Sequence, residues 1–116
     1  SRGLGDVYKR QVLNSKEYKE APFKVIVAHI PPIGGWHGNL EVENKFMPLL
    51  REAKPDLMLC GHLHRFVHQK ATAETPFPII VNSNTAVLKA AANSEELDVQ
   101  VIDTEGKVLD RFSVKK

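Results

Sequence analysis

Two short apolar runs with a helix-forming segment between them constrain the fold of this chain more than any other feature. Residues 23–28 (FKVIVA) and 56–60 (DLMLC) are each long enough for one strand and apolar enough to be buried on both faces. The segment from Leu40 to Ala53 places apolar residues on one helical face. A strand, a helix and a second strand in this order predict a parallel pair joined by a right-handed crossover.

The regions around this unit add one helical segment and a series of strands. Residues 16–21 are rich in helix formers and stop at Pro22, so we expect the last turns of a helix that begins further upstream. Asn39 is expected to cap the central helix, and Pro48 either kinks it or lies in its first turn. Glu105-Gly106 predicts a hairpin turn. Further strands are expected at residues 65–70, 78–82, 85–92, 97–103 and 107–114.

Composition bounds the class of protein without naming a function. The chain has 116 residues, of which 42% are hydrophobic, so it suffices for one packed domain. Its net charge of +2 comes from 16 basic and 14 acidic residues and gives no reason to expect nucleic acid or a membrane surface as partner. No run of about 18 apolar residues is present to span a bilayer. The single cysteine, Cys60, has no partner for an internal disulfide and is expected to be buried.

The opening string SRGLGDVYKRQ stands apart from the rest of the chain. It resembles a string that arises when sequencing-adapter bases are translated at the broken end of an assembled read. We therefore expect residues 1–11 to be a non-native leader and exclude them from the reasoning about the fold.

Four histidines follow the two predicted central strands. His29 and His37 come after the first strand, and His62 and His64 come after the second. In open α/β sheets ligands bind beyond the carboxyl ends of the strands, and neutral imidazole is a common ligand of zinc, iron and manganese. Gly61 is expected to allow a sharp turn after the second strand. We therefore predict a metal site that contains His29, His62 and His64, and the spacing of the last two suits a pair of neighbouring ions.

Other residues near these positions have open interpretations. His37 faces a substrate, supports a metal ligand, or is an incidental loop residue. Trp36 has three possible roles: it lines a pocket, it stacks on an aromatic leaving group, or its buried ring anchors the loop. His68 lies in a predicted strand and is expected to be solvated or at the edge of the core, without a role in the site. Asn82 and Asn84 border a strand end and are expected to be turn residues.

The segments that contain these histidines resemble a known family of enzymes. The stretches VIVAHIPP and DLMLCGHLHR resemble the C-terminal half of the calcineurin-like metallophosphoesterases, and HIPPIGGWHG is most similar to their purple acid phosphatase-like branch. The resemblance implies part of an α/β fold in which a β-sandwich, flanked by helices, holds two ions of iron, manganese or zinc. It further implies that His29 and His62 bind one ion and His64 the other. His37 would face the substrate phosphate and assist protonation of the leaving group, next to Trp36.

The resemblance covers only part of that family's site. The DxH, GDxxD-type and GNH motifs are not found before residue 23, and two divalent ions close together require a bridging carboxylate. We therefore expect residues 12–116 to be the C-terminal part of a phosphoester hydrolase domain that acts on a phosphorylated substrate. Its other partner would be the N-terminal half of the same domain, and this piece is expected to be inactive alone.

Two alternatives remain open at the level of sequence. One is a non-catalytic module that binds a single zinc ion through its histidines, because three nitrogen ligands and an open position are feasible for zinc. The other is a structural β-rich domain in which the histidines are incidental. The number of ions bound per chain distinguishes the first alternative from the hydrolase, and metal retention after replacement of His62 and His64 tests the second.

Overall fold

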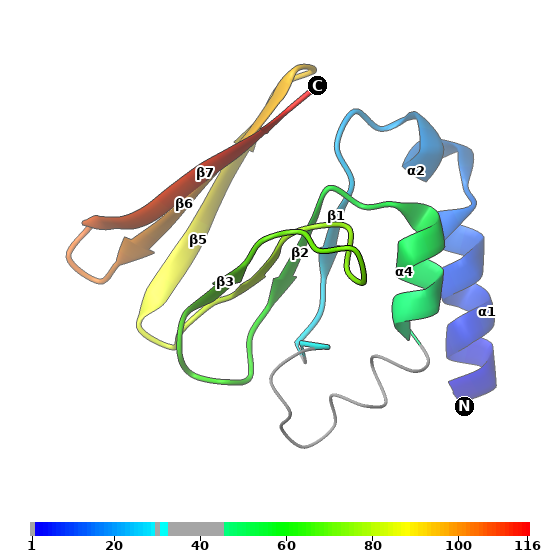
Figure 1. Cartoon of the computed structure of the whole chain (residues 1–116), viewed down its shortest axis with the longest axis horizontal. Helices are drawn as coiled ribbons and strands as arrows, with labels where there is room; N and C mark the ends of the chain where they lie inside the picture. Colours follow the sequence, from blue (N-terminus) through cyan, green and yellow to red (C-terminus); the bar gives the residue numbers. More distant parts are fainter. Residues whose placement is uncertain (1, 30, 33–45) are drawn as a thin grey trace.

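The computed structural model describes residues 2–29, 31–32 and 46–116, with side chains from residue 8 onward. A four-stranded sheet has helices on one side and a three-stranded sheet on the other (Figure 1). None of the described helices is both long and apolar enough to cross a membrane. The helices are α1 (Arg2–Leu13), α2 (Lys16–Glu20) and α4 (Met47–Ala53), and the strands are β1 (Val25–Val27), β2 (Leu57–Cys60), β3 (Val67–Gln69), β4 (Ile79–Val81), β5 (Ala86–Ala92), β6 (Glu96–Asp103) and β7 (Val108–Lys115).

The four-stranded sheet has the order β1-β2-β4-β3 and contains the predicted parallel unit. β1 pairs in parallel with β2, with Val25 opposite Leu57, which confirms the pairing expected from the sequence. The strands after the first unit pair mainly in the antiparallel sense, as predicted, in β3–β4, β5–β6 and β6–β7, and the exception is β4, which is parallel to β2. The reason is that β3 reverses the chain and lies at the far edge, so β4 returns between β2 and β3 in the direction of β2.

The three-stranded sheet is an antiparallel meander with the order β5-β6-β7. The turn between β6 and β7 lies at the predicted place, and Gly106 adopts a φ of 86°, a left-handed conformation that favours glycine. The N–H of Gly106 donates to the carbonyl of Asp103 at 3.1 Å. A register shift between Val101 and Ile102 marks an irregularity in the β6–β7 pair.

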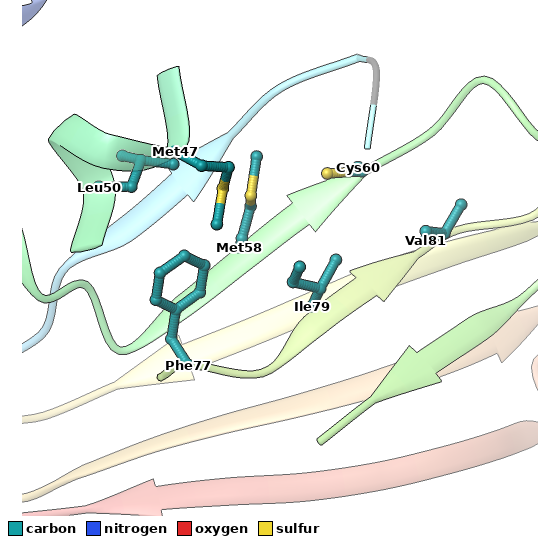
Figure 2. Packing of buried hydrophobic residues seen from close by; sticks show 7 residues of the cluster. All are labelled: Met47, Leu50, Met58, Cys60, Phe77, Ile79 and Val81. Carbon is teal, nitrogen blue, oxygen red and sulfur yellow. The ribbon is translucent and has the colours of Figure 1, made fainter. Parts of the chain in front are cut away.

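Hydrophobic side chains fill both faces of the four-stranded sheet because neighbouring residues of a strand point to opposite sides. Met58 of β2 packs under α4, whereas Leu57 faces the three-stranded sheet. Figure 2 shows the first cluster, in which side chains of α4 lie over β2 and β4. The buried residues of the first cluster are Met47, Leu50, Met58, Cys60, Phe77, Ile79 and Val81, and those of the second are Leu57, Ile80, Leu97 and Val99.

The burial of β1 differs from the expectation, because we predicted that this strand would be buried on both faces. Its residues are exposed, half-buried and exposed in turn, and Val27 is 77% exposed. β1 lies at the edge of the sheet, and no described strand pairs with its outer side. Apolar composition therefore identified the strand correctly but not its burial.

The helices agree with the predictions in part. Pro48 lies in the first turn of α4, one of the two positions expected, and Lys54 ends this helix in a left-handed conformation. The predicted cap Asn39 and residues 40–45 lie outside the described residues. α2 begins at its own cap, Ser15, whose Oγ accepts from the N–H of Tyr18 at 3.2 Å, so the expected upstream start is wrong. The boundary predicted between residues 11 and 12 falls inside α1 and stays a prediction.

Candidate metal site

The carboxyl ends of β1 and β2 lie side by side, as the parallel arrangement predicts. The N–H of Ala28 donates to the carbonyl of Leu59 at 2.9 Å, and the N–H of Gly61 donates to the carbonyl of His29 at 2.9 Å. His29 is therefore the backbone neighbour of Gly61, one position before His62. Two of the histidines selected from the sequence thus meet at the edge of the sheet where ligands of α/β proteins bind.

The rings of His29 and His62 are in direct contact. Nε2 of His29 lies 3.2 Å from Nδ1 of His62, and the ring planes meet edge to face at 88°. With metal–nitrogen bonds of about 2.0–2.1 Å, this separation corresponds to an angle of roughly 100° at one shared ion, within the range for tetrahedral zinc. The same distance allows a hydrogen bond between two neutral rings. The distance between the two nitrogens is therefore compatible with two ligands of a single cation.

The turn after β2 has an unusual backbone at both of its histidines. His62 has a φ of 71° and His64 a φ of 56°, a left-handed conformation that few residues other than glycine adopt. Between them, Leu63 packs against the core cluster under α4, and its N–H donates to the carbonyl of Gly61 at 2.8 Å. Leu63 thus anchors the turn and leaves the flanking histidines exposed. Backbone strain of this kind is concentrated at functional sites.

Gly61 does not have the backbone role that we expected. Among the described glycines, only Gly106 has a positive φ, so the left-handed positions of the turn are His62 and His64. A Cβ at Gly61 would lie 3.6 Å from Nδ1 of His29, which is ordinary van der Waals contact. The prediction that Gly61 provides the sharp turn is therefore wrong.

The remaining predicted site residues are not joined to this pair in the described part of the chain. No group of three or more His, Cys, Asp or Glu side chains able to hold a metal ion is found among the described residues, so His64 is not brought together with His29 and His62 in such a group. His37 and Trp36 lie outside the described residues. Metal binding by His29, His62 and His64 stays a prediction.

Sequence reasoning treated Asn82 only as a turn residue, but it lies at the end of β4 beside this site. Its N–H donates to the carbonyl of Cys60 at 2.9 Å, and its Nδ2 donates to the carbonyl of Ala86 at 2.8 Å. Its Oδ1 is buried, and none of the described residues donates to it. The sequence held a signal for this position, since Asn82 directly follows a buried parallel strand, as Gly61 does.

Two other residues are excluded from the site by their surroundings. The side chain of Cys60 is buried in the cluster under α4, away from the two histidine rings, and burial raises the pKa of its thiol to about 12. Nδ1 of His68 lies 3.1 Å from Oδ2 of Asp110, and its ring lies 5.0 Å from that of Phe112. His68 therefore links the two sheets at the edge of the core, one of the two positions expected for it.

A hollow of about 300 Å³ lies at the opposite end of the parallel strands. It is lined by Lys24, which precedes β1, by Lys54, which precedes β2, and by residues of α1, α2 and α4. The amino ends of the strands thus border this hollow, whereas the histidines follow the carboxyl ends. It is not the substrate pocket of the histidine pair.

Comparisons with known proteins connect this geometry to a fold. The sequence matches no family profile and no curated protein sequence. The structure is similar to that of GAP50, the anchor in the inner membrane complex of Plasmodium, with a TM-score of 0.64 and 15% identity. The match covers 96% of this chain and 41% of that chain. This likeness shows a shared fold, and the chain spans less than half of the length of GAP50.

Two structures of Vps29 from Entamoeba histolytica are also similar. A single mutant has a TM-score of 0.49 and 14% identity, over 83% of this chain and 57% of that chain. The wild-type protein complexed with Zn²⁺ has a TM-score of 0.45 and 15% identity, over 80% of this chain and 55% of that chain. Vps29 has a calcineurin-like metallophosphoesterase fold. The chain described here is a mixed α/β protein with two layered sheets and few helices, as the sequence predicted.

Proposed function

We propose that this chain is the histidine-bearing part of a metal-dependent phosphoester hydrolase domain of the purple acid phosphatase-like type. The observation that carries the proposal is the contact of 3.2 Å between Nε2 of His29 and Nδ1 of His62. Both residues follow strands of a parallel pair, and their side chains meet although 33 positions separate them in the sequence. The strained turn that presents His62 adds support, because such a backbone is retained where function requires it.

In this proposal each residue has a defined part. Nε2 of His29 and Nδ1 of His62 hold one cation of iron, manganese or zinc, and His64 serves the second cation. Bound cations of this kind supply an activated water and neutralise charge on a phosphoryl group. His37 and Trp36 contact the phosphorylated substrate, and His37 protonates the leaving group. The task of the β1 and β2 ends is to fix the imidazole nitrogens before the cation arrives.

The open edge of β1 leads to a further part of the proposal, in which the rest of a longer domain is the partner of this chain. Val27 is 77% exposed and Val25 is 38% exposed, and an apolar edge strand of this kind is a template for pairing with another strand. The same edge ends at His29, where two cations would need carboxylate ligands that the described residues do not bring there. We propose that additional strands pair beside β1 and carry these carboxylates.

A second candidate function is a non-catalytic module with one metal ion. A specific observation favours it, since two histidines and not three come together in the described part of the chain. In this case the cation would stabilise the junction of β1 and β2 and would perform no hydrolysis.

Calorimetric titration with Zn²⁺ and with Mn²⁺ tests the metal site in this chain. We expect the wild-type chain to bind a cation, His62→Ala to lose at least tenfold in affinity, and His68→Ala to bind normally because its ring contacts Asp110 and Phe112 instead. Equal affinity in the wild type and in His62→Ala would refute the proposed site.

Turnover distinguishes the two candidate functions. The hydrolase proposal expects no cleavage of an aryl phosphate by this chain alone, and two ions with turnover in a longer protein that includes the missing carboxylates. One ion per chain and no turnover in that longer protein would establish the single-metal module instead.

A further inference from the structure

The ends of three strands, and not only two, lie in one row at the histidine edge. The N–H of Gly61 donates to the carbonyl of His29, and the N–H of Asn82 donates to the carbonyl of Cys60, both at 2.9 Å. β2 lies between β1 and β4 in the sheet. His29, Gly61 and Asn82 therefore occupy successive positions across β1, β2 and β4.

The side chains of this row share one face of the sheet. Ala28, Cys60 and Val81 all pack in the cluster under α4, so the residue after each of them points toward the three-stranded sheet. The hydrogen bond from Nδ2 of Asn82 to the carbonyl of Ala86 in β5 agrees with this direction. Asn82 and the ring of His29 thus lie on the same side of Gly61.

The central position of the row carries no side chain, and this leaves room between its neighbours. Nδ1 of His29 lies 3.6 Å from the place where a Cβ of Gly61 would be, so the ring leans over the glycine. The amide of Asn82 begins one strand further on, at a spacing of about 4.8 Å. Nδ1 of His29 therefore lies over the central glycine, on the side of β2 toward Asn82, although no direct hydrogen bond joins it to Oδ1 of Asn82 in this structure.

Oδ1 of Asn82 requires a hydrogen-bond donor, and a protonated Nδ1 of His29 requires an acceptor. Oδ1 of Asn82 is buried, and none of the described residues donates to it, although the Nδ2 of the same amide is satisfied by Ala86. His29 can offer a lone pair on Nε2 in the neutral state only if its proton is on Nδ1. Metal-binding histidines almost always donate this second N–H to an oxygen.

We propose that Asn82 is a positioning residue for His29. Its Oδ1 accepts a hydrogen bond from Nδ1–H of His29 through one bridging water, since no direct bond joins them, and so directs the Nε2 lone pair toward His62. The relevance of this bond to a cation rests on the proposed function. The same hydrogen bond fixes the direction of the contact between the two rings in the metal-free chain. Nδ1 of His62 must then donate to Nε2 of His29 across their distance of 3.2 Å.

Long-range ¹H–¹⁵N correlation of the imidazole rings tests this proposal in the full metal-free chain. The spectra are recorded under alkaline conditions, in which imidazole is neutral. We expect His29 to carry its proton on Nδ1 in the wild type. Asn82→Leu should shift the proton toward Nε2, and Asn82→Asp, which keeps an acceptor, should retain it on Nδ1. Asn84→Leu, in the exposed loop that follows, should leave His29 unchanged.

Two results would overturn the proposal. One is a wild-type His29 with its proton on Nε2, a result that needs no variant to fold. The other is an unchanged His29 in a folded Asn82→Leu chain.

A Zn²⁺ titration of the same variants separates this proposal from the proposed function. We expect Asn82→Leu to weaken Zn²⁺ binding by about tenfold or more, with Asn82→Asp and Asn84→Leu near the wild type. A wild-type chain with His29 protonated on Nδ1 that binds no Zn²⁺ would refute the metal site and leave the positioning role standing. Binding that is lost in His62→Ala but unaffected in Asn82→Leu would refute the positioning role and leave the metal site standing.

Discussion

β4 and β1 have nearly the same sequence and opposite surroundings. β4 reads Ile-Ile-Val and is buried at all three positions, whereas β1 reads Val-Ile-Val and is exposed, half-buried and exposed. β4 has a strand on each side and a packed layer on each face, while β1 pairs with a described strand on one side only. Apolar residues therefore specify a strand, and the neighbours of the strand decide whether it is buried.

The same contrast applies to the candidate site. β2 is a central strand and ends in a turn that is anchored by Leu63, whereas β1 is the edge strand and ends at His29. The two histidines therefore join a fully supported strand to one whose outer side pairs with no described strand. The open edge strand β1 leads to the candidate site at His29, which agrees with the proposal that further strands complete this site.

The largest expected effect comes from truncating one side chain in each of the two strands. Ile80→Ala in β4 should lower the free energy of unfolding by about 2–5 kcal/mol, because Ile80 is fully buried between the sheets. Val27→Ala in β1 should change it by less than about 0.5 kcal/mol, because Val27 is 77% exposed. Urea denaturation measures both values. Equal losses in the two variants would show that β1 is not an open edge.

The second-largest expected effect is a dependence of stability on alkaline pH, which arises from the buried thiol of Cys60. Burial holds the pKa of Cys60 at about 12 in the folded chain, against about 9 in the unfolded chain, so the unfolded state releases this proton first as the pH rises. The contribution of the thiol to stability is complete below pH 9 and is lost between pH 9 and pH 12, at up to about 1.4 kcal/mol per pH unit.

A matched variant isolates this effect from other groups that titrate at alkaline pH. Cys60→Ala combined with Val27→Cys moves the thiol to the exposed edge, and its unfolding free energy should lack the additional alkaline slope. Denaturation curves of the two chains from pH 8 to pH 11 make the comparison. Parallel pH profiles would contradict the difference in burial.

The link between the two sheets should have a smaller effect. His68→Ala removes the contact of 3.1 Å with Asp110 and the ring contact with Phe112, and we expect a loss of about 1 kcal/mol in unfolding free energy. Arg111→Ala serves as the control, since Arg111 pairs with Asp98 on the exposed face, and it should cost less. A double-mutant cycle of His68 with Asp110 should show coupling, and its absence would contradict the contact.

The smallest expected effect is that of a methyl group at Gly61. Gly61→Ala should change the unfolding free energy by less than about 0.5 kcal/mol, because φ is not positive there and the methyl group meets Nδ1 of His29 at an ordinary distance of 3.6 Å. Thermal unfolding measures the change. A loss of several kcal/mol would restore the original expectation that the turn requires glycine.

Local pattern explains which parts of the fold were predictable. Alternation and apolar runs predicted each of the seven strands that the described residues form, because the period of side chains along a strand is a local property. The parallel pairing of β4 with β2 was missed, because the choice of partner depends on where β3 had already been placed. The exposure of β1 was missed for the same reason, since it depends on strands that are distant in sequence.

The candidate site was predictable to the extent that topology determines it. The rule that parallel strands end together brought His29 and His62 to one edge, and the structure places their nitrogens 3.2 Å apart. The left-handed conformations of His62 and His64 could not be read from residue type, which favoured Gly61 instead. Asn82 was overlooked because its significance lies in an unsatisfied oxygen, which only a three-dimensional structure shows.

Diffraction data collected across the zinc absorption edge, from crystals of this chain grown with Zn²⁺, test the central claim most directly. The claim is that the ends of β1 and β2 together form a cation site. We expect an anomalous peak within about 2.0–2.1 Å of both Nε2 of His29 and Nδ1 of His62. A peak that touches neither nitrogen, or rings of His29 and His62 that remain in direct contact with no ion at saturating Zn²⁺, would contradict it.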